Sequence, residues 1–512
     1  MIWAVPAAIC AVLIGAFVFR PRMGPLYRGD FQGIKTEAIL GPIITLAVFV
    51  SALVIAQANS TYQRGSQAAS QEANAVELLY ENAGLLPDDG GTPIQGTAIC
   101  YARAVSRIEF PAVADGGGQS RAVDWWTGEF NREIPKVIDG PGSVVGQVVS
   151  LNRQQTEARA SRIYDAEPHL PLFTVILMLS AVIFVVTALA TFAVTDMRRG
   201  FVLGLVGALA LLLGSTLFMV EQLEEPFSGI IRVKPSATEK SLDRMERSLP
   251  PGEQLPCDES GRPVPTPNPA VAAAAKAKGV EPLVGCTNVG YPPMSYADPL
   301  AATPTGYTGF SIDLAQAIAD KAGRPLVIEE QPLDRQADAV DVGLCDAIVG
   351  AYTVTAEVAQ EVDFTQPYFT VDLSIVVPTG SQVGTGGLDS LRGKTIGVRT
   401  AYGAKSFTND NRPVGSTVKE YATNEQLAVA LRNGEVDAVL IPEPAAIVAT
   451  NQDPSVTIAA TVPTEQQLAY ATAKDGDRAT FDLLNNGITE AKADETYAAL
   501  YRKYFNEDPP AA

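Results

Sequence analysis

The chain has 512 residues, of which 47% are hydrophobic and 19% charged, and its mean hydropathy is +0.11. Its net charge of −19 argues against a nucleic-acid partner, because neutralising phosphates requires clustered Lys and Arg. The single histidine, His169, leaves little room for histidine-based zinc sites or Ser-His-Asp triads. The length predicts at least two domains, and the apolar content predicts that part of the chain lies in a membrane.

Four stretches are apolar, free of ionisable side chains and about 20 residues long, which is the length that crosses a bilayer. A secretory signal peptide would carry basic residues before the first stretch, whereas Arg20 and Arg22 come after it. The lack of charges within the stretches argues against a proton-coupled transporter. We therefore expect a membrane α-helical fold in the first half, with transmembrane helices at 2–19, 38–56, 170–194 and 201–220.

Basic residues in the connecting loops predict how these helices are oriented. Positive residues favour the cytoplasmic side of a membrane. They occur in the two loops that share one side, as Arg20, Arg22, Arg28 and Lys35 in the first loop and Arg198 and Arg199 in the second. The N-terminus, segment 57–169 and everything after 220 are then outside the cytoplasm. The predicted localisation is a multi-pass protein of a bacterial cell membrane, with the lipid bilayer as a partner.

Four of the five cysteines fall in the segments expected outside the cytoplasm, where disulfides form. Cys100, Cys257, Cys286 and Cys345 allow three pairings, which the sequence does not distinguish. Cys257, in a proline-rich segment, is favoured to be bonded. Cys286 and Cys345 could instead be buried free thiols of strands.

Segment 57–169 is expected to form a helical stalk, because its apolar residues recur three and four positions apart. Several short motifs stand within and after it: Glu72-Ala73 with Leu79-Tyr80, Tyr101 to Val105, Glu109-Phe110, Trp125-Trp126, and Glu225 to Gly229 with Arg232-Val233 and Pro235. On these motifs, residues 1–245 resemble the bestrophin-like domain family of unknown function. The family name implies similarity to anion channels.

Residues 246–282 are rich in proline and alanine. Segments of this composition act as semi-rigid spacers of about 3.1 Å per residue. We expect this segment to be a linker that holds the last domain away from the first.

Strands and helices alternate in residues 283–512, which predicts parallel sheets with helices on both faces, repeated in two lobes. Characteristic motifs follow in order: Tyr291-Pro292-Pro293, Tyr307 to Phe310, Cys345 to Ile348, Val362 to Phe364, Leu391 to Lys394, Val436 to Val439 and Tyr501 to Phe505. On these motifs the region resembles the family 3 extracellular solute-binding proteins, the polar amino-acid receptors of ABC importers. The resemblance implies a periplasmic-binding-protein fold, with lobe 1 at about 283–376 and 469–512 and lobe 2 at about 377–468.

The resemblance also implies a ligand site between the lobes, and this sequence departs from the family there. The arginine that binds an α-carboxylate in the family is replaced by Val358, and the aspartate that binds the amino group aligns with Pro442, next to Glu443. The turn that offers backbone N–H groups reads Ala401-Tyr402-Gly403. Candidate ligand-binding residues are Tyr291, Tyr296, Leu333, Ala351, Tyr352, Thr353, Val358, Tyr402 and Glu443.

The leading hypothesis is a membrane-anchored extracellular solute-binding protein whose ligand is a small polar solute other than a standard α-amino acid. It would deliver the solute to an ABC permease or report its presence. The alternatives are a ligand-modulated bestrophin-like channel, in which the chain forms a homo-oligomer, and an accessory subunit of a membrane complex with a degenerate cleft and a protein partner. No enzyme, cofactor or metal is expected, because no nucleophile–base set or ligand cluster stands out.

Overall fold

The computed structural model describes residues 36–87, 90–167, 225–250, 252–265, 279–298, 305–400 and 404–510, with a few isolated positions between 176 and 223 and at 275–277. The chain divides into two compact units, Met1–Arg262 and Pro263–Ala512. Each unit is described by itself.

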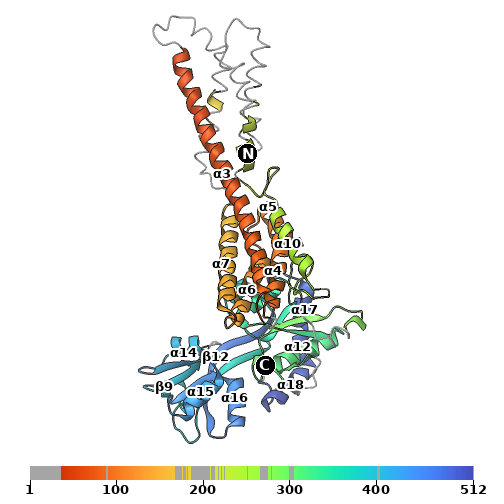
Figure 1. Cartoon of the computed structure of the whole chain (residues 1–512). Helices are drawn as coiled ribbons and strands as arrows, with labels where there is room; N and C mark the ends of the chain where they lie inside the picture. The colour runs from red at the N-terminus through yellow and green to blue at the C-terminus, as the bar shows by residue number, and fades with distance from the viewer. Residues whose placement is uncertain are drawn as a thin grey trace. The chain divides into compact units, whose positions relative to one another are not determined.

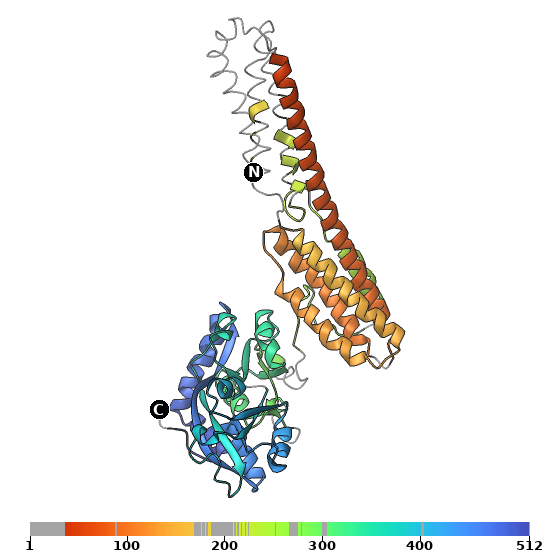
Figure 2. The same ribbon diagram turned by 90° about the vertical axis from the view of Figure 1, so that its left-hand side faces the viewer.

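The regular elements among the described residues of the N-terminal unit are all helices. Its elements are α3 (Thr36–Ala83), α4 (Thr92–Ala104), a π-helical turn η2 (Val105–Glu109), α5 (Phe110–Ala114), α6 (Arg121–Glu133), η3 (Ile134–Val137), α7 (Gly142–Tyr164) and α10 (Ser236–Ser248). The long helix α3 packs against α7 over much of the length of α7 (Figures 1 and 2), and α4 and α10 also pack on α3. Buried aromatic and aliphatic side chains fill the space between these helices, among them Ile94, Ile99, Trp126 and Phe130.

The predicted membrane α-helical fold is wrong for the described residues: no helix among them is both long enough and apolar enough to cross a bilayer. The predicted span 38–56 falls in α3, which continues without a break into polar residues such as Arg64 and Glu72. Of the other three predicted spans, 2–19 lies outside the described residues, and 170–194 and 201–220 are described only at scattered positions. The multi-pass localisation is therefore without support.

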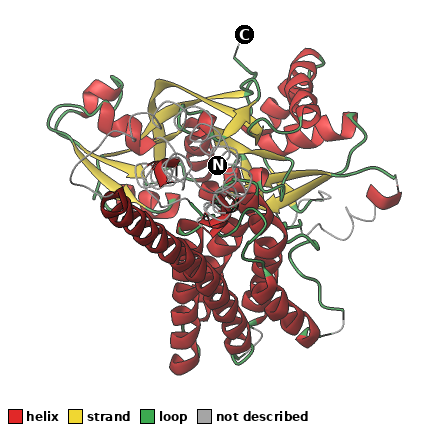
Figure 3. Cartoon of the chain, turned by 90° about the horizontal axis from the view of Figure 1, so that it is seen from above, coloured by secondary structure: helices red, strands yellow, loops and turns green. Residues whose placement is uncertain are grey.

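All the strands of the described residues belong to the C-terminal unit (Figure 3). One sheet has the strand order β10-β9-β11-β8-β12-β6-β1-β5, with β7 paired to β12, and a small sheet has the order β2-β3-β4. The bounds are β1 (Leu283–Thr287), β2 (Gly290–Tyr291), β3 (Ser295–Ala297), β4 (Tyr307–Thr308), β5 (Leu326–Glu330), β6 (Ala347–Thr353), β7 (Val362–Phe364), β8 (Phe369–Pro378), β9 (Thr395–Arg399), β10 (Thr417–Tyr421), β11 (Ala438–Pro442) and β12 (Val456–Ala473).

The helices of this unit alternate with the strands. They are α12 (Phe310–Lys321), η4 (Leu333–Arg335), α13 (Gln336–Asp341), η5 (Val358–Gln360), η6 (Leu388–Leu391), α14 (Ala404–Asp410), α15 (Asn424–Arg432), α16 (Glu443–Gln452), α17 (Arg478–Ala493) and α18 (Thr496–Phe505). The flanking strands pair in parallel, β5 with β1 and β10 with β9, whereas the central strands β8 and β12 are antiparallel. The predicted two-lobed α/β fold is confirmed, and β8 and β12 connect its lobes.

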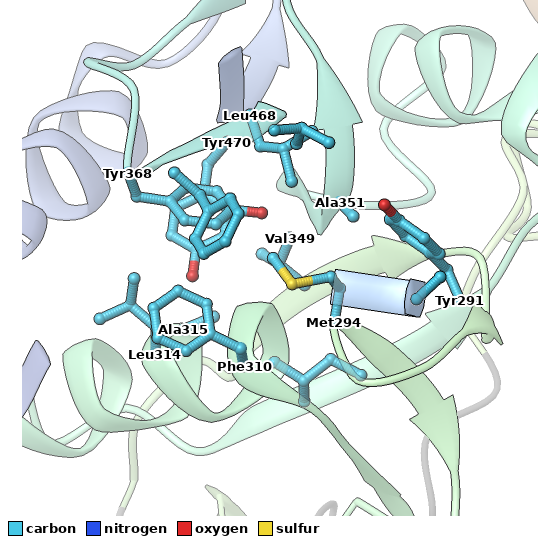
Figure 4. Close-up of a cluster of buried hydrophobic side chains, with 14 of the residues drawn as sticks. Tyr291, Met294, Phe310, Leu314, Ala315, Val349, Ala351, Tyr368, Leu468 and Tyr470 are labelled. Carbon is cyan, nitrogen blue, oxygen red and sulfur yellow. The ribbon is translucent and has the colours of Figure 1, made fainter. Parts of the chain in front are cut away.

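The larger hydrophobic core of this unit is centred on Phe310, the first residue of α12. Its ring lies against Tyr497 and Tyr501 of α18, with centroid distances of 5.3 and 5.9 Å. Figure 4 shows Phe310 facing Tyr368 and Tyr470 on one side of the cluster, with Tyr291 and Ala351 at its edge. A second, smaller core includes Leu373 and Ile375 of β8.

Candidate functional site

A narrow crevice opens at the carboxyl ends of β1 and β6, where ligands of parallel α/β sheets bind. It holds about 190 Å³ of space between atoms, none of it wide enough for a water molecule. The crevice is lined by Asn288, Tyr291, Ser295, Leu333, Gln336 and Ala351. Three of the predicted ligand-binding residues, Tyr291, Leu333 and Ala351, therefore come together (Figure 4 labels two of them).

Local hydrogen bonds hold the polar residues of the crevice in place. Ser295 donates its hydroxyl to the backbone carbonyl of Asn288 at 2.7 Å, which ties β3 to the end of β1. The Gln336 amide, 1% exposed, donates to the carbonyl of Gln331 at 3.1 Å. Sequence reasoning missed Asn288, Ser295 and Gln336. For Asn288, the position directly after a buried strand was a signal that could have found it.

Three further predicted residues lie along or just after β6. Tyr352 is buried beside Phe364, with ring centroids 5.8 Å apart. Burial raises the pKa of Tyr352 to about 12, and the charges of Glu361 and Asp338 add to the shift. Thr353 pairs with Leu468 of β12, and half-buried Val358 begins η5, where its N–H donates to the Thr355 hydroxyl at 3.2 Å.

The remaining predicted residues lie elsewhere. Tyr296, in β3, is half-buried, and burial together with the charges of Asp298 and Asp313 raises its pKa. Glu443, at the start of α16, accepts a hydrogen bond from Thr461 and does not line the crevice. Tyr402 lies outside the described residues.

The four cysteines that were predicted to lie outside the cytoplasm form two disulfides, one in each unit. Cys286 of β1 is bonded to Cys345, just before β6, with Cα atoms 5.7 Å apart. This bond ties together the two strands that end at the crevice. Cys100 of α4 is bonded to Cys257, also with a Cα separation of 5.7 Å, and fastens the segment after α10 to the helical unit.

The motifs of the N-terminal unit converge on a buried ionic cluster. Arg162 is fully buried and contacts Glu72 and Glu109, while Arg159 contacts Glu109 through two nitrogen atoms. The Tyr101 hydroxyl donates to Glu72 at 2.6 Å. Burial raises the pKa of Tyr101, and the Glu72 carboxylate raises it further. Both arginines come from the inner face of α7, and the sequence had not singled them out.

Comparison with known proteins finds a family match for each half. Residues 283–507 match the model of the bacterial extracellular solute-binding proteins, family 3, and residues 7–238 match the model of the bestrophin-like domain. The two halves match two different families. Both resemblances expected from the sequence are confirmed.

Curated relatives match the family 3 half. The histidine-binding periplasmic protein of Escherichia coli K12 is 27% identical over 208 residues, which cover 39% of this chain and 80% of that protein. The putative ABC transporter arginine-binding protein 2 of the same organism is 25% identical over 236 residues, covering 45% and 93% of the two chains. A solved ancestral arginine-binding protein bound to arginine is 29% identical and covers 44% of this chain and 97% of that chain, with a TM-score of 0.38. The two curated relatives are binding proteins, which agrees with a solute-binding function for the family 3 half.

Proposed function

We propose that the family 3 half binds a small polar solute that is not a free α-amino acid, and that it passes this solute to an ABC permease or reports its presence. The family match supports solute binding, and the names of the relatives point to ABC importers as the setting. The proposal departs from those relatives only in the chemistry of the ligand.

The observation that carries this departure is Val358. Family resemblance places a carboxylate-binding arginine at this position, and a valine cannot make a bidentate, charge-assisted contact. The crevice residues do not replace that charge, because all six are uncharged: Asn288, Tyr291, Ser295, Leu333, Gln336 and Ala351. A crevice of amide, hydroxyl and aromatic groups suits a solute that hydrogen-bonds without a formal negative charge.

Binding requires the crevice to open, since it has no room for a water molecule. All six lining residues belong to lobe 1, so a ligand must separate the segments that follow β1 and carry β3 from η4 and β6, while rotation about β8 and β12 would bring lobe 2 over the bound ligand. A ligand would then stabilise the conformation in which it contacts more residues.

The experiment is a thermal unfolding screen of the intact chain against amino acids, polyamines, dipeptides, sugars and organic acids. A ligand at 100 times its dissociation constant adds about 2.7 kcal/mol. A family 3 half of this size should then melt about 5–10 °C higher. Tyr291→Ala should remove the shift, whereas Tyr164→Ala, at a 66% exposed tyrosine of the helical unit, should retain it.

A second candidate is a protein-binding module with a degenerate cleft. The lack of space in the crevice favours it. A flat response to the whole panel from a well-folded chain would support this candidate, whereas a shift with free α-amino acids alone would contradict the proposed ligand class.

A further inference from the structure

A group of oxygen-bearing side chains lies on one face of the strands that join the two lobes. Pro442 of β11 pairs with Leu373 of β8, and Ile441 pairs with Ser374. If this antiparallel pairing is extended by one residue, Glu443 lies opposite Asp372. Glu443 is also the first residue of α16, which packs on β8 and β12.

The side chains of Asp372 and Ser374 leave the same face of β8, because residues two apart in a strand share a face. On the other side of β8, Thr461 of β12 pairs with Ser374. The Thr461 hydroxyl donates to Glu443 Oε1 at 3.3 Å. Since β8 lies between β11 and β12, the Glu443 carboxylate reaches across β8 on the face that carries Asp372 and Ser374.

Ser374 is the unusual member of this group. It is 0% exposed, and its Oγ has no hydrogen-bond partner among the described residues. A buried hydroxyl without a partner costs free energy, so such groups are uncommon unless water or an ion satisfies them. This hydroxyl therefore points to a ligand on the same face.

The charges of the group are not balanced. No Lys or Arg of the described chain forms an ion pair with Glu443 or Asp372 within 4.0 Å. The Thr464 N–H donates to Asp372 Oδ1 at 3.3 Å, and the Thr461 hydroxyl donates to Glu443, but neither donor carries a positive charge. A positively charged partner would relieve the repulsion between the two neighbouring carboxylates.

We propose that Glu443, Asp372, Ser374 and Thr461 bind a divalent, oxygen-preferring cation such as Ca²⁺ at the junction of the two lobes. Such ions take six to eight oxygen ligands, often with water among them. No three His, Cys, Asp or Glu residues of the described chain are gathered for a metal, so the two hydroxyls and water complete this site. Because its ligands come from β8, β12 and α16, the ion would restrain movement of lobe 2 about the connecting strands.

The test is calorimetric titration of the intact, chelator-treated chain with CaCl₂, followed by thermal unfolding with and without the ion. We expect one saturable site and a higher melting temperature in Ca²⁺. Glu443→Gln and Asp372→Asn should each weaken binding at least about tenfold, as expected for the loss of a charged ligand. Asp389→Asn removes an exposed carboxylate from lobe 2 and should leave the titration unchanged.

Both amide variants should fold, because each removes a like charge from the pair. Ser374→Ala provides a further check: it removes the buried hydroxyl without changing the charge, and it should weaken Ca²⁺ binding in a folded chain. No heat of binding and no change in melting temperature in the parent chain would overturn the proposal. Stabilisation by acid alone, with no effect of Ca²⁺, would also overturn it, since protonation would then satisfy the carboxylates. Neither result bears on solute binding in the crevice.

Discussion

Arg162 and Glu72 form an ion pair inside the N-terminal unit in which neither side chain is more than 2% exposed. The two residues lie on α7 and α3, 90 positions apart in the chain. Arg162 also contacts Glu109, and its guanidinium lies 4.9 Å above the Phe110 ring. Its position in the core is therefore fixed by Glu72 of α3 and by the consecutive residues Glu109 and Phe110.

Replacing Arg162 by methionine should destabilise the N-terminal unit by about 3–5 kcal/mol, because it leaves the buried Glu72 carboxylate without a cationic partner and leaves Glu109 with Arg159 alone. Arg153→Met is the control, since Arg153 pairs with Glu157 on the same helix and both side chains are more than 70% exposed. The control should cost less than about 0.5 kcal/mol. Urea unfolding of the intact chain, followed by circular dichroism, measures both. Equal losses would mean that the buried cluster contributes no more than a surface pair.

The same cluster should make the N-terminal unit sensitive to acid. Burial by itself would raise the pKa of Glu109, but Arg162 and Arg159 outweigh it and hold the pKa of that carboxyl below its usual value. A carboxyl with a lowered folded-state pKa stabilises the fold above its unfolded pKa of about 4.3, and this stability is lost as pH falls through the folded value.

The urea midpoint of the N-terminal unit should therefore fall as the pH drops from about 5 to about 2. Glu109→Gln should lower the midpoint at neutral pH and flatten its pH dependence in the acid range. A midpoint in the parent chain that stays constant down to pH ~2 would contradict this assignment.

The sequence predicted the C-terminal fold better than the site, for a physical reason. Alternating strands and helices are local patterns, so the two lobes could be predicted from them. The contacts of Asn288, Ser295 and Gln336 depend on how elements far apart in the sequence pack together, and the periodicity of the local sequence does not predict them. Arg159 and Arg162 were missed for the same reason. Helical spacing predicts that they share one face of α7, but it does not predict which residues of other helices they contact. Apolar composition led to the wrong fold class in the first half, because α3 continues into polar, packed residues.

Gly261 should be intolerant of a side chain because of a close backbone approach. Its φ is +90°, and a Cβ would lie 2.2 Å from the Ala104 nitrogen, while its carbonyl accepts a hydrogen bond from the Trp126 indole at 2.7 Å. Gly252 has a similar φ of +89° but nothing within 4 Å of its would-be Cβ.

Gly252→Ala should cost only the backbone strain of about 1–2 kcal/mol. Gly261→Ala should cost at least about 2 kcal/mol more and change the tryptophan fluorescence, because the segment must move away from α4. Unfolding and emission spectra of the two variants give the comparison. Equal costs would show that the segment is not held against α4.

The Cys100–Cys257 disulfide should account for a large part of the stability of the N-terminal unit. It joins residues 157 positions apart, and a loop of this length is worth about 5 kcal/mol in the chain-entropy model, with about 2–4 kcal/mol typical of measurement. A Cys100→Ser, Cys257→Ser double variant should therefore unfold at lower urea. Cys286→Ser with Cys345→Ser should instead affect the C-terminal unit. If either double variant destabilised the other unit instead, the assigned pairing would be contradicted.

Val358→Arg should give the family 3 half affinity for free α-amino acids. Val358 is half-buried at the start of η5, next to the Thr355 hydroxyl, and family resemblance places a carboxylate-binding arginine there. A hydrogen-bonded charge is worth about 1.5–3 kcal/mol, so binding should strengthen about 10- to 100-fold. Val429→Arg, at a 46% exposed position on α15, is the matched control. Each variant is titrated with histidine and arginine and with the decarboxylated forms of both. The comparison shows whether a gain in affinity depends on the carboxylate. A gain for the carboxylate-bearing ligands alone would identify Val358 as the residue that excludes them, whereas no gain would mean that the cleft lacks more than this one contact.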